Sequence, residues 1–134
     1  MAKVYIDAAA SLNPKLAAGA VIIKDNTLNF EKTVFLGEMD NHEAEWATLL
    51  FAVREAAALD ITSMIVYTDS KIIVDTFDKQ HVKNKVFKSY FDKLLPLTNA
   101  LDMFIITHTP RKNNRGADNL AKACLYKERK SYKD

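Results

Sequence analysis

Met64-Ile65-Val66-Tyr67-Thr68-Asp69 is a short apolar run that ends in a carboxylate. The run is too short for a typical helix, so it predicts a buried strand over 64–68. Helical patterns flank it, over 42–59 before it and over 70–78 after it. Strands that are joined through helices run parallel, by right-handed crossovers. The run therefore predicts a parallel strand in a sheet that has helices packed on it.

Three strands are expected before the first helix, and their short connections predict an antiparallel meander. After the flanked strand, the pattern predicts another helical stretch, broken or bent near Pro96, then a fifth strand and a last helix. The expected strands are 3–9, 17–24, 28–37, 64–68 and 103–107, and the expected helices are 42–59, 70–78, 84–101 and one that starts near Arg115. The order βββαβαβα predicts an α/β protein with a mixed five-stranded sheet and helices on both faces.

Composition sets the broad class. The length of 134 residues fits one domain over 1–134, and 49% hydrophobic with 27% charged residues is typical of soluble globular proteins. Cys124 is the only cysteine, so nothing indicates an oxidising compartment. Neither a signal peptide nor a run of about 18 apolar residues is evident. We therefore expect a cytoplasmic protein without a membrane partner.

The formal charge is only +2, but the basic residues are unevenly distributed. They gather in three segments, which are 79–93, 108–115 and 127–130. Basic patches beside an acidic centre would suit a polyanion. The same residues could also be solvated helix faces and a frayed tail, and composition alone favours this second interpretation.

Four acidic residues stand where they could converge. Asp7 and Asp69 each end an apolar run, while Glu45 and Asp118 lie in the first turns of two expected helices. Ligands of open α/β sheets usually bind at the carboxyl ends of the strands. Four carboxylates gathered there would repel one another unless cations bound, and Mg²⁺ or Mn²⁺ would suit such an oxygen-rich site. Taken singly, each of the four could instead be a solvated strand end or a helix-start residue.

Four stretches in chain order carry a resemblance to a known family. They are Tyr5-Ile6-Asp7 with the loop up to Asn13-Pro14, Asn41-His42-Glu43-Ala44-Glu45, Tyr67-Thr68-Asp69-Ser70, and the segment from His108 through Arg111, Asn114 and Asp118 to Leu120-Ala121. Together they resemble type 1 ribonuclease H, in the short bacterial and archaeal branch that lacks a basic handle insertion. The resemblance covers nearly the whole chain.

The resemblance implies a metal-dependent endonuclease that hydrolyses the RNA strand of an RNA–DNA hybrid with two Mg²⁺ or Mn²⁺ ions. Asp7 would bridge both ions, Glu45 and Asp69 would complete one site, and Asp118 would complete the other. His108 would be a catalytic residue that serves proton transfer or product release. The residues implied to contact nucleic acid are Asn13, Asn41, Ser70, Arg111 and Asn114. No small-molecule cofactor is implied, and we expect a monomer.

Two departures from the family pattern keep an alternative open. Ala8 and Lys15 stand where the family usually has glycine, in the loop where backbone groups approach the RNA. A catalytically weak or inactive module that binds hybrids or double-stranded RNA would accommodate these changes. A resolvase or integrase relative is a third possibility, against which the ending around His108 and Arg111 argues.

Overall fold

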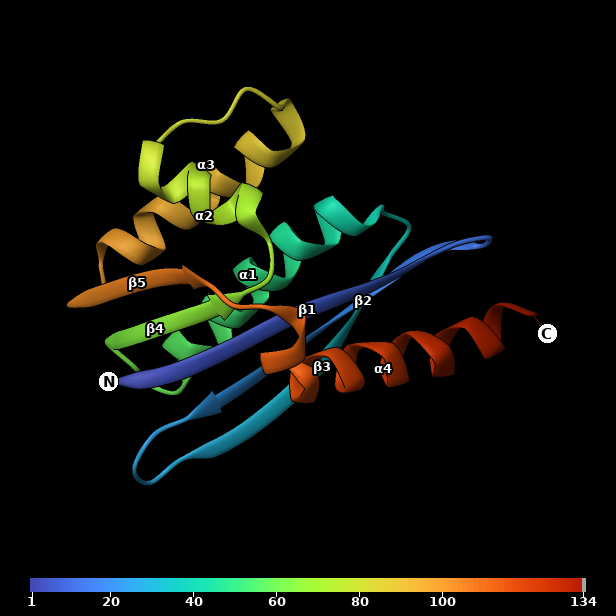
Figure 1. The fold of residues 1–134 in the computed structure, drawn as a ribbon, viewed down its shortest axis with the longest axis horizontal. Helices are drawn as coiled ribbons and strands as arrows, with labels where there is room; N and C mark the ends of the chain where they lie inside the picture. The colour runs from blue at the N-terminus through green and yellow to red at the C-terminus, as the bar shows by residue number, and fades with distance from the viewer. Residues whose placement is uncertain (134) are drawn as a thin grey trace.

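The computed structural model describes residues 1–133 and contains one five-stranded sheet with helices on both faces (Figure 1). The strand order is β3-β2-β1-β4-β5. The strands are β1 (Ala2–Leu12), β2 (Lys15–Lys24), β3 (Asn29–Gly37), β4 (Ser63–Thr68) and β5 (Met103–His108). The helices are α1 (Asn41–Ala58), α2 (Lys71–Lys79), α3 (Lys85–Asn99), a 3₁₀ turn η1 (Arg111–Asn113) and α4 (Arg115–Lys133).

The strand pairing confirms the predicted mixed sheet. β1 pairs antiparallel with β2, β2 pairs antiparallel with β3, and β1–β4 and β4–β5 are parallel. Both helices expected between β4 and β5 are present as α2 and α3, so the full order has one more helix than the string βββαβαβα. The predicted α/β class is confirmed.

Three elements differ from the predictions by two or more residues at one end. β1 and β2 extend to Leu12 and Lys15 in a hairpin, beyond the expected 3–9 and 17–24, because small alanines let the two strands stay paired. Pro96 lies inside α3 and does not break it, but the helix ends three residues later at Asn99 rather than at 101. Proline lacks an N–H, so it removes one helical hydrogen bond and favours an early end.

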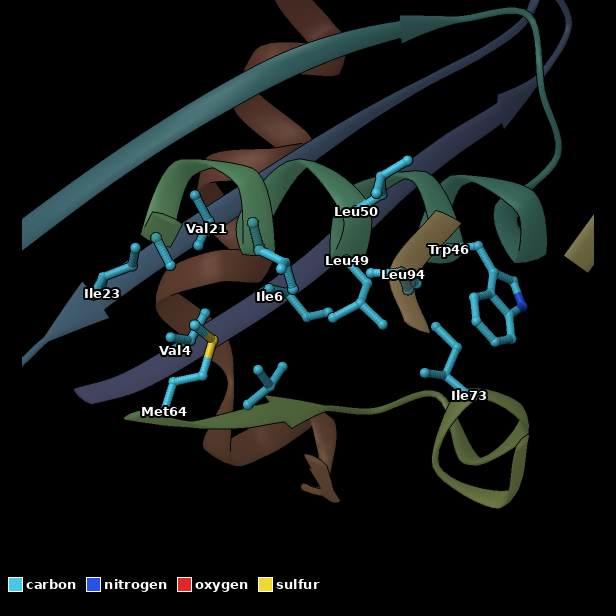
Figure 2. Close-up of a cluster of buried hydrophobic side chains, with 14 of the residues drawn as sticks. Val4, Ile6, Val21, Ile23, Trp46, Leu49, Leu50, Met64, Ile73 and Leu94 are labelled. Carbon is cyan, nitrogen blue, oxygen red and sulfur yellow. The ribbon is translucent and has the colours of Figure 1, made fainter. Parts of the chain in front are cut away.

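The sheet separates two apolar clusters. Side chains alternate along a strand, so Val4 and Ile6 point to one face, where Figure 2 shows them with residues of α1 such as Leu49. On the opposite face, Ala18 and Ala20 of β2 pack against Ala121 and Leu125 of α4. Trp46 is 1% exposed and belongs to the first cluster. None of the helices in the described part of the chain combines the length and apolarity that a membrane crossing requires.

Gly19 sets how closely α1 approaches the sheet. A Cβ built on Gly19 of β2 would overlap the Thr48 hydroxyl and lie 3.0 Å from Thr48 Cβ. Thr48 is fully buried, and its Oγ1 donates a hydrogen bond to Ala44 O at 2.7 Å, which fixes the side chain. The contact holds the first half of α1, and with it Glu45, against the middle of the sheet.

We expect Gly19→Ala to lower the free energy of unfolding by about 1–3 kcal/mol, because α1 must move or Thr48 must lose its hydrogen bond. Urea unfolding followed by circular dichroism measures the change. Gly116→Ala is a matched control, since its added Cβ would meet only the flexible end of Ile22 at 3.0 Å. Equal losses for the two variants would contradict this account of α1 packing.

Candidate active site

The parallel pairing of β1 with β4 brings Asp7 and Asp69 to equivalent positions. Tyr5 and Tyr67 are partners in the register, and their rings stack at 4.9 Å between centroids. Each aspartate lies two residues beyond its tyrosine, past the last paired position of the two strands. Asp69 follows the end of β4 and Asp7 lies inside β1, both as predicted, but β1 continues beyond the expected residue 9 to Leu12.

Glu45 and Asp118 reach the same region from two helices. Asp118 lies in the first turn of α4, as predicted. α1 begins at Asn41 with Asp40 as its cap, so Glu45 lies just after the first turn rather than in it. Asp7, Glu45 and Asp69 line one small hollow together with Thr48 and other neighbours. The carboxyl of Asp118 is close enough to share a hydrogen bond with that of Asp7.

Asp7 is the most perturbed member of this group, which we call the carboxylate cluster (Asp7, Glu45, Asp69 and Asp118). Burial, then the charge of Asp69 and the hydrogen bond to Asp118, raises the pKa of Asp7 from 3.8 to about 8. The side chain is only 5% exposed, and within the described residues its Oδ2 has no hydrogen-bond partner. The raised pKa favours the protonated form of the Asp7 carboxyl near neutral pH, with the Asp118 carboxyl as its neighbour.

The other two perturbed members of the cluster shift in opposite directions. Burial and then the charge of Asp69 raise the pKa of Glu45, against a lowering hydrogen bond from Ser70. Burial alone would raise the pKa of Asp118, but hydrogen bonds from Lys122 and Asp7, with nearby positive charge, bring it below its ordinary value. The raised pKa values and the nearby basic side chains together reduce the repulsion between the carboxylates of the cluster.

Two basic residues hold the outer carboxylates. Lys122 Nζ lies 3.0 Å from Asp118 Oδ2, one helical turn along α4. Arg111 Nε lies 3.6 Å from Asp69 Oδ2. Both side chains are more than half exposed, so these ion pairs are weak and can exchange partners.

The donor chemistry of the cluster fits a hard divalent cation. Carboxylate oxygens are the ligands that Mg²⁺ and Mn²⁺ prefer, and Asp7 Oδ2 is a buried oxygen in need of a positive partner. Within residues 1–133, however, no three His, Cys, Asp or Glu side chains are arranged to hold a metal ion as they stand. Binding an ion there would require side-chain rotation and exchange of the Lys122 and Arg111 pairs.

Three predicted residues lie around the cluster. His108 is exposed at the end of β5, and it is the register partner of Thr68, which directly precedes Asp69. Asn41 Nδ2 donates to Glu45 Oε1 at 3.4 Å. Ser70 is 6% exposed; it caps α2 by accepting from the Ile73 N–H at 3.3 Å, and it also hydrogen-bonds to Glu45. Ser70 therefore positions the cluster and has little surface for nucleic acid.

The remaining two predicted contacts are placed elsewhere. Asn13 occupies the tip of the β1–β2 hairpin, six residues along the strand from Asp7, which is about 20 Å at the usual rise. Asn114 is 3% exposed, and its Nδ2 donates to Ile6 O at 2.7 Å, which ties the start of α4 to β1. A nucleic-acid contact by Asn114 has no exposed surface in this structure, because the side chain is used inside the fold.

Sequence reasoning missed Lys122 as a neighbour of the cluster. Its position four residues after Asp118 on a helix was the available signal, because side chains at that spacing share a helical face. The buried role of Asn114 had no comparable signal, since it depends on a contact with a strand more than a hundred residues earlier.

The fold, with sheet order β3-β2-β1-β4-β5 and α1 and α4 on opposite faces, matches solved ribonuclease H1 structures, and the chain is a ribonuclease H-type enzyme. The chain belongs to the reverse transcriptase-like family, whose model matches residues 6–124.

Individual relatives match along almost the whole chain. EbsB of Enterococcus faecalis, provisionally named a hydrolase, is 31% identical over 129 residues, which are 95% of this chain and 96% of that protein. The crystal structure of RNase H1 from Halobacterium salinarum is 25% identical with a TM-score of 0.86, over 94% of this chain and 98% of that one. LC11-RNase H1, solved in complex with an RNA/DNA hybrid, is 25% identical with a TM-score of 0.87, over 96% and 99%.

The raised pKa of Asp7 predicts how stability depends on pH in the absence of divalent metal. Between the ordinary value of 3.8 and about 8, the folded protein binds more protons than the unfolded chain. The free energy of unfolding should therefore fall as pH rises from about 5 to about 8. Asp7→Asn retains a hydrogen-bond donor for Asp118 without a charge, so its profile should be flatter, and near pH 8 it should be more stable than wild type by about 1–3 kcal/mol.

Urea unfolding across this pH range, in a chelating buffer, measures both profiles. Asp75→Asn, which removes an exposed carboxylate from α2, should behave as wild type. Parallel profiles for wild type and Asp7→Asn would show that Asp7 is ionised throughout and would contradict the assignment.

Proposed function

We propose that this protein is a divalent-metal-dependent endonuclease that hydrolyses the RNA strand of RNA–DNA hybrids. The carboxylate cluster carries this proposal. It brings together acidic side chains of β1, α1, α4 and the residue after β4, and Asp7 Oδ2 is a buried oxygen with no hydrogen-bond partner among residues 1–133. The hybrid bound to LC11-RNase H1 supports the choice of substrate. Membership of the reverse transcriptase-like family supports the reaction class.

Asp7, Glu45, Asp69 and Asp118 would hold the metal. Bound divalent cations supply the charge that activates a water and stabilises the departing oxygen of a phosphodiester. Asp7 is central to the arrangement, because it neighbours Asp69 and Asp118 on either side. Ser70 and Asn41 orient Glu45 through hydrogen bonds, so the conformation of this ligand is restricted before metal arrives.

His108 would carry a proton at the open edge of the site. It is exposed, and the backbone beside it is fixed because Thr109 N–H donates to Thr68 O at 2.8 Å. An imidazole can accept or release a proton near neutral pH, which suits departure of a product group. Arg111 is exposed beside Asp69 and would meet a substrate phosphate when it leaves that carboxylate.

Substrate selection would depend on the shape of the duplex rather than on bases. RNA-containing helices are recognised through the minor groove and their 2′-hydroxyls. The hairpin tip with Asn13 and the start of α1 with Asn41 project polar side chains that could meet these groups. Little sequence preference and strong salt dependence are expected.

The decisive experiment is cleavage of a labelled RNA–DNA hybrid in Mg²⁺ or in Mn²⁺. Wild-type protein should cut only the RNA strand, and Asp69→Asn should lower the rate by about 10²-fold or more, because a metal ligand is lost. Double-stranded DNA and double-stranded RNA should remain intact. Asp75→Asn, an exposed acid on α2, is the matched control and should retain full activity.

Two outcomes would change the assignment. Salt-sensitive hybrid binding without turnover in either metal would favour an inactive binding module, for which the missing glycines at Ala8 and Lys15 give a reason. Equal rates for wild type and Asp69→Asn would point to a contaminating nuclease.

Metal binding can be tested separately from catalysis. Because an ion would neutralise the repulsion around Asp7, Mg²⁺ or Mn²⁺ should raise the melting temperature, with a stabilisation of about 2.7 kcal/mol at a hundred times the dissociation constant. Asp7→Asn should lose most of this stabilisation, and Asp75→Asn should keep it. The metal site would be refuted if neither metal changed the melting temperature, or if the melting temperature of Asp7→Asn rose as much as that of the wild type.

A further inference from the structure

One face of α4 points away from the sheet and has no place in the core. Arg115, Asn119, Lys122, Tyr126 and Lys130 are all exposed on it, and we call them the α4 stripe. At 100° per residue they fall within an arc of about 80°. The opposite face of the helix carries Ala121 and Leu125 against the sheet. The fold therefore does not explain the composition of the α4 stripe.

The α4 stripe combines cations with an aromatic ring and contains no acidic residue. Arg115 makes no ion pair within residues 1–133. Tyr126 is 61% exposed, which is unusual for a large aromatic side chain on a helix of a folded domain. Lys130 Nζ lies 4.5 Å from the centre of the Tyr126 ring, so a positive charge and an aromatic ring lie side by side on the surface.

The α4 stripe meets the carboxylate cluster in the first half of the helix. Lys122 is the residue in it that contacts the cluster, 3.0 Å from Asp118. From Arg115 to Lys130 the helix advances about 22 Å. Figure 1 shows α4 leaving the centre of the sheet as one long helix, so the stripe leads outward from the candidate active site.

We propose that the α4 stripe binds a single strand of nucleic acid that continues beyond the hybrid held at the carboxylate cluster. Cations that follow a phosphate backbone, together with an aromatic side chain on which a base can stack, are the features that bind single strands without sequence preference. The length of the stripe matches about six nucleotides at 3.4 Å each. This inference rests on the proposed function, since it assumes that a hybrid occupies the neighbouring site.

The test compares a short blunt hybrid with the same hybrid carrying a single-stranded RNA overhang of about six nucleotides, at either end. Asp69→Asn protein in Mg²⁺ is the parent, so that binding is measured without cleavage by fluorescence anisotropy. One of the two overhangs should tighten binding about tenfold or more. It should also steepen the dependence of log K on log salt by about 0.7 for each cation engaged, or about two for Arg115, Lys122 and Lys130.

Variants of the α4 stripe should remove this gain and leave binding of the blunt hybrid unchanged. Arg115→Gln with Lys130→Gln should lower the added salt dependence by about 1.4. Tyr126→Ala should lose about fivefold or more of the affinity for the overhang at all salt concentrations, because stacking is not screened. Lys83→Gln with Lys85→Gln removes the same charge at the start of α3 and should keep the full gain.

The outcomes separate this inference from the proposed function. A parent protein that binds neither hybrid would refute the proposed function itself. If the blunt hybrid binds normally and neither overhang increases the affinity, only the inference about the α4 stripe would be overturned. A gain that survives in the stripe variants, or a stripe variant that weakens both hybrids equally, would also overturn it, and the basic face would then be a solvated surface.

Discussion

The burial of Asp7 on the central strand is the constraint around which the rest of the site is arranged. A carboxylate that is 5% exposed and lacks a partner for one oxygen is destabilising when ionised. The raised pKa of Asp7, the neighbouring Asp118 carboxyl and the cations of Lys122 and Arg111 offset this cost. Neither ion pair is strong, since both basic side chains are more than half exposed. A divalent cation that binds the cluster can therefore displace the proton of Asp7 and the Lys122 and Arg111 side chains.

The packing of α1 on the sheet is the second requirement. Glu45 reaches the cluster only because α1 lies close to β2, and that closeness depends on the missing side chain at Gly19 and on fully buried Ala52 and Ala56. Ser70 then connects the end of β4 to Glu45 while capping α2. A core contact and a helix cap therefore determine where one acidic side chain points. Residues that never meet a substrate can for this reason affect the site.

Sequence patterns were sufficient for the elements and for the convergence of the acidic residues, because both depend on periodicity and on strand direction. The strand at 64–68 and the helix at 42–59 are confirmed within a residue or two. The patterns failed where the answer depends on contacts between distant segments. β1 continues to Leu12, beyond the expected end at residue 9, because β2 continues to pair with it, and Asn114 is buried because it meets Ile6 O. The positions of the carboxylate oxygens could not be predicted from the sequence either, because they depend on side-chain rotamers and on the ion pairs with Lys122 and Arg111.

α4 contributes to the candidate site, to the core and to the solvent-exposed surface, each with a different face. Asp118 belongs to the cluster, Ala121 and Leu125 belong to the core, and the α4 stripe faces solvent. At physiological ionic strength charges are screened beyond about 8 Å, so a polyanion responds to the local distribution and not to the net charge of +2. An acidic centre that attracts cations and a basic helix face that leads away from it can therefore act on one nucleic-acid chain at the same time. Among the described residues the Lys122–Asp118 pair is the one ion pair that joins the two surfaces, so substitutions in the outer part of the stripe should be separable from the chemistry.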